Sequence, residues 1–226
     1  MRKQPILTGE YYHIYNRGVD KRDIFSDESD LSRFIESVCE FNIIDTIGSL
    51  ANLRKTRVAP QTAPKALSEP LVSIIVYCFN PNHFHFILKQ LVDGGIAKFM
   101  QKLQAGYSCY FNAKHTRTGA LFQGTFKAHL IKSDNYFKKT IGYVNNNNEI
   151  HDIPKNKINL VSSSNHEYKD NNFKIVSKID GEEILELFGG NKKFVKHCKE
   201  IVAIIRKERG KASLLEEDNL PDSASR

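Results

Sequence analysis

The chain of 226 residues lacks any run of about 18 apolar residues, which is roughly the length that a membrane-spanning helix needs. Its basic first residues are not followed by the apolar stretch of a secretion signal. It also lacks a CxxC pair, because its four cysteines are scattered along the sequence. We therefore expect a cytoplasmic protein with reduced thiols and no membrane partner.

Negative charge is comparatively scarce. Lysine and arginine number 33 against 26 aspartates and glutamates, a formal net charge of +7. Such an excess suits a polyanionic partner, and nucleic acid is the usual one. A basic protein with a solvated surface has the same balance, so charge alone does not decide between the two.

Hydrophobic periodicity predicts an α+β fold. The expected order is strand, helix, strand, strand, helix, strand, helix, at residues 11–16, 27–47, 71–79, 83–90, 96–114, 125–131 and 134–148. The first six elements match a ferredoxin-like unit, an antiparallel sheet with helices packed on it, and the seventh is an extra helix. Helix caps are expected at Ser26 or Asp27 and at Ser133. Residues 52–70, with three prolines, are expected to form a loop.

The composition changes after Ile150. Residues 151–175 are polar, and two short amphipathic helices are expected after them, at 182–188 and 192–207. We therefore expect three parts in the chain: a domain over 1–150, a small helical C-terminal appendage over 151–210, and a disordered tail over 211–226.

Two histidines lie in a segment that otherwise reads as a buried strand, in the triplet His83-Phe84-His85. Side chains alternate faces along a strand, so both imidazoles are expected on one face, with Phe84 and Phe86 on the other. Two neighbouring imidazoles can bind one metal ion. Taken alone, such a pair is more often structural than ligating.

The helix expected over 134–148 carries Tyr143 and Asn147, four residues apart and so on the same face. At that spacing both side chains could face the histidines. Each also has an ordinary interpretation, Tyr143 as a residue of an amphipathic helix and Asn147 as a C-cap. Tyr136 is the rival nucleophile, but Thr140 stands at its corresponding offset, where Tyr143 has Asn147.

These features occur together in a fixed order. The histidine triplet follows Pro81-Asn82, a Tyr-x-x-x-Asn helix comes downstream, HIYNRG lies in the first strand, and the loop RTGALFQ spans 117–123. Over residues 10–150 the sequence resembles the single-tyrosine HUH transposases, and most closely their REP-associated branch. It departs from that family at Asn80, where methionine is common, at Asn148, where proline is common, and at Thr125, where arginine is common.

The resemblance implies a DNA transposase that nicks and rejoins single-stranded or hairpin DNA through a 5′-phosphotyrosine. It implies Tyr143 as nucleophile, and His83, His85 and Asn147 as ligands of Mg²⁺ or Mn²⁺. Relatives are monomers or homodimers, and a nucleoid-associated place in a bacterial cytoplasm is expected. Candidate DNA-contact residues are Arg17, Lys114, Arg117, Lys127, His129, Lys132, Lys138 and Lys139.

Other interpretations of the pattern stay open. A non-catalytic nucleic-acid binder could use the same fold, since ferredoxin-like sheets with exposed aromatic residues bind RNA. A rolling-circle replication initiator would share the histidine pair, although such proteins more often carry further domains. His13 and His129 are expected to be polar sheet residues or DNA contacts rather than ligands.

Overall fold

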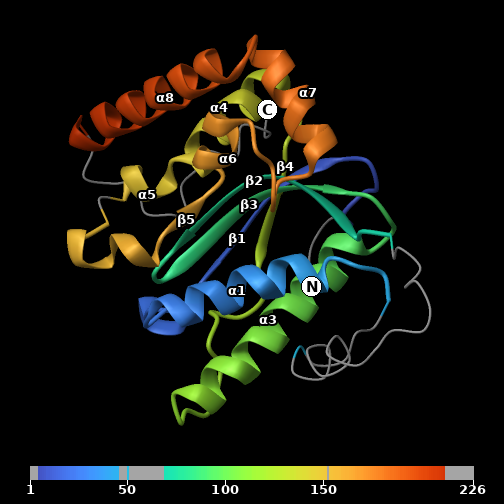
Figure 1. Ribbon diagram of the computed structural model, residues 1–226, viewed down its shortest axis with the longest axis vertical. Coiled ribbons are helices and arrows are strands. Elements are labelled where there is room, and N and C mark those ends of the chain that lie inside the picture. Colours follow the sequence, from blue (N-terminus) through green and yellow to red (C-terminus); the bar gives the residue numbers. More distant parts are fainter. Residues whose placement is uncertain (1–4, 46–49, 51–68, 152, 212–226) are drawn as a thin grey trace.

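The computed structural model describes residues 5–45, 50, 69–151 and 153–211 (Figure 1). Within these residues one antiparallel sheet has the strand order β4-β1-β3-β2-β5. Its strands are β1 (Tyr11–Arg17), β2 (Val72–Asn80), β3 (His83–Gln90), β4 (Lys127–Leu130) and the short β5 (Ser162–Ser163). The first four strands have the order of a ferredoxin-like fold, so the predicted fold class is confirmed.

Helices cover both faces of the sheet. The described elements are η1 (Val19–Lys21), α1 (Glu28–Phe41), α3 (Gly95–Lys114), α4 (Asp134–Asn145), α5 (Asn147–Ile150), η2 (Lys155–Leu160), α6 (Asn165–Asp170), α7 (Lys178–Phe188) and α8 (Asn191–Lys211). Figure 1 shows α1 and α3 on one face and α4, α6, α7 and α8 on the other. Among the described residues, no helix is long and apolar enough to cross a membrane.

The first helix begins where the sequence predicts and ends earlier. The Asp27 side chain accepts a hydrogen bond from the backbone N–H of Asp30, as an N-cap should. The helix ends at Phe41, not near Ile47. The loop expected over 52–70 falls almost entirely within 51–68, which lie outside the described residues, as does the tail from residue 212.

The helices that follow residue 150 share the core of the sheet. Tyr168 and Phe194 are fully buried, and their rings stack with centroids 4.2 Å apart. The Tyr168 hydroxyl also donates to the backbone carbonyl of Ile75 in β2. The described residues of the part expected over 151–210 therefore form a layer that packs directly on the sheet.

The helix expected over 134–148 is broken, so the prediction of one continuous helix is wrong. It begins after the expected cap Ser133, but α4 ends at Asn145 and α5 starts at Asn147. Between them Asn146 has φ −119° and ψ 27°, outside the helical range. Asparagine side chains compete with helical backbone bonds by forming their own, and here Asn145 accepts a hydrogen bond from the Ser164 hydroxyl.

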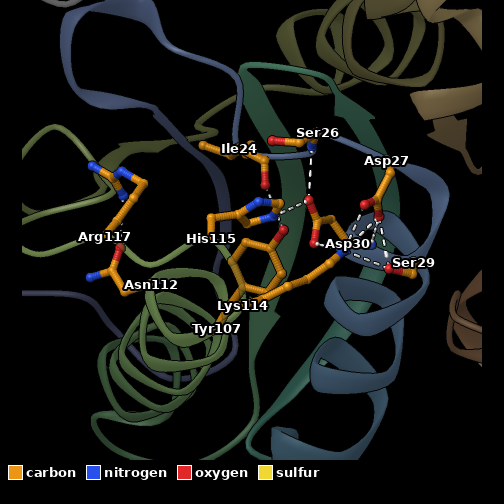
Figure 2. Close-up of polar contacts among 10 residues, drawn as sticks. All are labelled: Ile24, Ser26, Asp27, Ser29, Asp30, Tyr107, Asn112, Lys114, His115 and Arg117. Carbon is orange, nitrogen blue, oxygen red and sulfur yellow. Dashed lines mark hydrogen bonds and ion pairs between the residues drawn. The ribbon is translucent and has the colours of Figure 1, made fainter.

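A buried carboxylate joins α1 to the end of α3 (Figure 2). The Asp30 side chain is fully buried, and its oxygens lie 2.7 Å from Lys114 Nζ and 2.9 Å from His115 Nε2. It also accepts from the backbone N–H of Ser26. Lys114 binds Asp27 as well, and this hydrogen bond is the main reason that the pKa of the Asp27 carboxyl lies well below its usual range.

Replacing Asp30 with asparagine is expected to lower the free energy of unfolding by about 2–4 kcal/mol, because it leaves a buried ionic network without its central charge. Urea denaturation followed by circular dichroism measures this change. Asp27→Asn is the matched control, since Asp27 is half exposed and should cost well under half as much. Equal effects of the two variants would contradict a central role for Asp30.

Candidate active site

The pairing of β1 with β3 places the two histidines. Arg17 is opposite His83 and Tyr15 is opposite His85, so these side chains share one face. That face lies toward α4 and α5. Phe84 points the other way and packs against Phe34 of α1 with ring centroids 5.5 Å apart. The predicted alternation of the triplet is therefore confirmed.

The hydrogen bonds of His83 indicate which of its ring nitrogens could bind a metal ion. Its Nδ1 lies 2.6 Å from Oδ1 of Asn82. The amide nitrogen of Asn82 donates to the carbonyl of Lys21, which fixes the oxygen toward His83. Because Oδ1 can only accept, Nδ1 of His83 carries the proton, and a neutral ring then has a lone pair on Nε2. Ligating histidines are usually held in this way by a partner on the second nitrogen.

Two further polar atoms lie beside that lone pair. Nε2 of His83 lies 2.9 Å from Oδ1 of Asn147, and the amide nitrogen of Asn80 lies 2.9 and 2.8 Å from these two atoms. All three side chains are buried. Neighbouring ligands of an ion with bonds of about 2.1 Å lie roughly 3.0 Å apart. The 2.9 Å between His83 Nε2 and Asn147 Oδ1 therefore matches two neighbouring ligands of Mg²⁺ or Mn²⁺, although Asn147 comes from α5 and not from the helix of Tyr143.

The ring of His85 is held from behind by a residue of β1. Nδ1 of His85 lies 2.9 Å from Nε2 of His13, and the two rings stack. Burial lowers the pKa of His13 to about 3, and burial followed by the neighbouring His13 lowers the pKa of His85 well below its usual value. Both rings are neutral at pH 7, which is the form of imidazole that binds metals. Because Nδ1 of His85 is bonded to His13, Nε2 is the ring nitrogen of His85 that could bind a metal ion.

The side chain of Tyr143 lies beside the histidines of the sheet. Its ring meets His85 and His13 edge to face, with centroids 5.6 and 5.9 Å away. On its other side it packs against the apolar cluster of Ile150 and α8. A Cβ on the preceding residue, Gly142, would lie 2.7 Å from Ile201 of α8, so only glycine lets the two helices approach this closely. The C-terminal layer thus supports the helix that carries the candidate nucleophile.

A pocket of about 160 Å³ opens beside the histidines. Its lining residues are Tyr15, Asn16, Arg17, His83, His85, Gln123 and Lys127. Arg17 and Lys127 bring positive charge to it, and the Arg17 guanidinium is held by the Gln123 side chain. A polar pocket with two cations next to a metal-type donor set suits a phosphate group.

The other basic candidates are divided between the two faces. Lys114 and Arg117 belong to the α1–α3 side, where Lys114 is bound by carboxylates and Arg117 by Asn112 (Figure 2). These contacts connect both residues to the α1–α3 side, while their predicted contacts with DNA stay predictions. The remaining candidates lie near α4 or on β4: Lys132, Lys138, Lys139 and His129. His129 is exposed and bonds the Tyr15 hydroxyl at 3.2 Å.

The structure therefore brings His83, His85, Tyr143 and Asn147 together, while their roles as ligands and nucleophile stay predictions. Sequence reasoning missed two members of the cluster, His13 as the partner of His85 and Asn80 as the partner of Asn147. The alternation of β1 was a usable signal for His13, because His13, Tyr15 and Arg17 must share a face. For Asn80 the only signal in the sequence was its difference from the family that the chain resembles, in which methionine is common at this position.

Residues 59–147 match the family described as IS200-like transposases. The match includes the histidine triplet, Tyr143 and Asn147, and it ends before the C-terminal layer. It confirms the resemblance that the motifs predict and, with it, the class of enzyme, a DNA transposase.

Comparison with solved structures adds two likenesses. A REP-associated tyrosine transposase bound to a REP hairpin has a TM-score of 0.47 and 15% identity, covering 78% of this chain and 89% of that one. The tRNA(His) guanylyltransferase of Saccharomyces cerevisiae has a TM-score of 0.35 and 11% identity, covering 98% and 85%. None of the curated proteins matches the sequence significantly. The likeness to the IS200-like transposases accordingly rests on residues 59–147, fewer than half of the residues of the chain.

Proposed function

We propose that the protein is a metal-dependent transposase of single-stranded DNA that cuts and rejoins strands through a 5′-phosphotyrosine. The observation that carries this proposal is the meeting of Tyr143 with a metal-type donor set, His83, His85 and Asn147, on one face of the sheet. The REP hairpin bound by the tyrosine transposase named above suggests hairpin DNA as the substrate to test.

The chemistry would follow from the side chains. Oη of Tyr143 forms a bond to the phosphorus, the bond from phosphorus to the 3′ oxygen breaks, and that oxygen leaves as a free hydroxyl. The phenolic proton is lost and the 3′ oxygen gains one. A divalent cation held by the histidines and Asn147 would polarise the phosphate and offset its developing charge. Arg17 and Lys127 would hold the neighbouring backbone in the pocket. Reversal of the step rejoins a strand without an external energy source.

The test determines which side of the cut strand becomes attached to the protein. Protein, Mn²⁺ and a hairpin oligonucleotide with a single-stranded arm are incubated, and the products are separated under denaturing conditions. With a label at the 3′ end, we expect the label on a covalent protein adduct. With a label at the 5′ end, we expect a shortened free strand whose 3′-hydroxyl a polymerase can extend. Binding without any adduct, across Mg²⁺, Mn²⁺ and a panel of hairpins, would instead support a non-catalytic nucleic-acid binder.

A further inference from the structure

The Asn80 side chain lies beside His83 and Asn147, at about the separation that neighbouring ligands of one cation have. Asn80 is the last residue of β2, its side chain is fully buried, and its amide nitrogen donates to both neighbouring acceptors. Nε2 of His83 and Oδ1 of Asn147 lie 2.9 Å apart, and in a neutral His83 whose ring proton is on Nδ1 both atoms present lone pairs. A cation could bind this pair only if the N–H₂ group turned away.

The amide can turn and find a new hydrogen-bond partner for its nitrogen. Rotation about the last torsion of asparagine is soft, and it exchanges the nitrogen with the oxygen. On the far side, Oδ1 of Asn80 now accepts from the Cys78 thiol at 3.7 Å. After rotation the amide nitrogen would donate to that sulfur, and the thiol could donate to Oδ1 of Asn148, 3.8 Å away.

Building on the function proposed above, we infer that Asn80 is a further metal ligand, whose side-chain oxygen joins His83 and Asn147 around the cation. Amide oxygens are suitable ligands for Mg²⁺ and Mn²⁺. At present Asn80 donates to both neighbours, and rotation would leave three acceptors that face one point. Dense packing around a fully buried side chain favours this rotation over withdrawal of Asn80 from the site.

The test measures Mn²⁺ affinity by isothermal titration calorimetry, without DNA. Asn80→Leu is expected to weaken binding about tenfold or more, because it removes one oxygen from the donor set. Asn80→Asp is expected to bind at least as tightly as the wild type, because a carboxylate has only oxygens to present. Thermal unfolding without metal checks that both variants fold.

Two patterns would overturn the inference. If Asn80 only donates hydrogen bonds that orient its neighbours, both variants bind weakly, because neither can donate. If its N–H₂ group merely competes with the cation, Asn80→Leu binds as tightly as the wild type or more tightly. Asn148→Asp controls for added charge, since it places a carboxylate nearby but outside the triangle, and it should change affinity less than Asn80→Asp. Absence of Mn²⁺ binding by the wild type would instead count against the proposed function itself.

Discussion

Phenylalanine in place of Tyr143 is expected to abolish the covalent protein–DNA adduct and to lower strand cleavage by at least about 10⁴-fold. The substitution removes one oxygen, the atom that bonds to phosphorus in the proposed step. The phenyl ring keeps the edge contacts with His85 and His13 and the packing on α8, so the fold should be preserved. The rate of adduct formation under single-turnover conditions measures the effect, and fluorescence anisotropy should find DNA affinity within about threefold of wild type.

Tyr136 supplies the matched control. It lies seven residues before Tyr143 on α4, about 10 Å nearer the start of the helix, and therefore farther from the histidines. We expect Tyr136→Phe to keep cleavage within a few-fold of wild type. An adduct that persists in Tyr143→Phe and vanishes in Tyr136→Phe would reverse the assignment of the nucleophile.

The parts of the fold that local rules control were predictable from the sequence. The alternation of β3 placed His83 and His85 on one face of the sheet. Successive side chains of a strand point to opposite faces, so both histidines lie on the face opposite to the buried Phe84. Caps at Asp27 and Ser133 marked two helix starts, since their side chains satisfy backbone N–H groups whatever else surrounds them. Family resemblance then joined distant segments into one site.

The parts that depend on distant contacts were not predictable. Asn146 interrupts the helix because the neighbouring asparagines, Asn145 and Asn147, bond to the N-cap of α6 and to the end of β2. Hydrophobic periodicity does not reveal these partners. The C-terminal layer was expected as an appendage, because residues 151–175 are polar and sparse in apolar residues. A few large side chains such as Tyr168 and Phe194 are enough to anchor it, since each buries a large apolar area.

Loss of His83 is the second change with a large expected effect. His83→Ala removes the lone pair that Asn82 directs toward Asn147, so the cation would lose a ligand that is already oriented. Metal stabilisation of a phosphoryl transition state is worth several kcal/mol, and each 1.4 kcal/mol is a factor of ten, so cleavage should fall by about 10²–10³-fold. Single-turnover cleavage with saturating DNA and graded Mn²⁺ measures this loss.

DNA affinity should behave differently in the same variant. The cations of the pocket, Arg17 and Lys127, stay in place, and contacts to the phosphate backbone carry most of the affinity. Anisotropy in the presence of EDTA should therefore give nearly equal dissociation constants for wild type and His83→Ala. His129→Ala, at an exposed position of β4, should keep its metal dependence. Equal loss of binding and cleavage in His83→Ala would mean that the histidine supports the structure of the site, because a residue that only positions a cation has no reason to weaken metal-free binding.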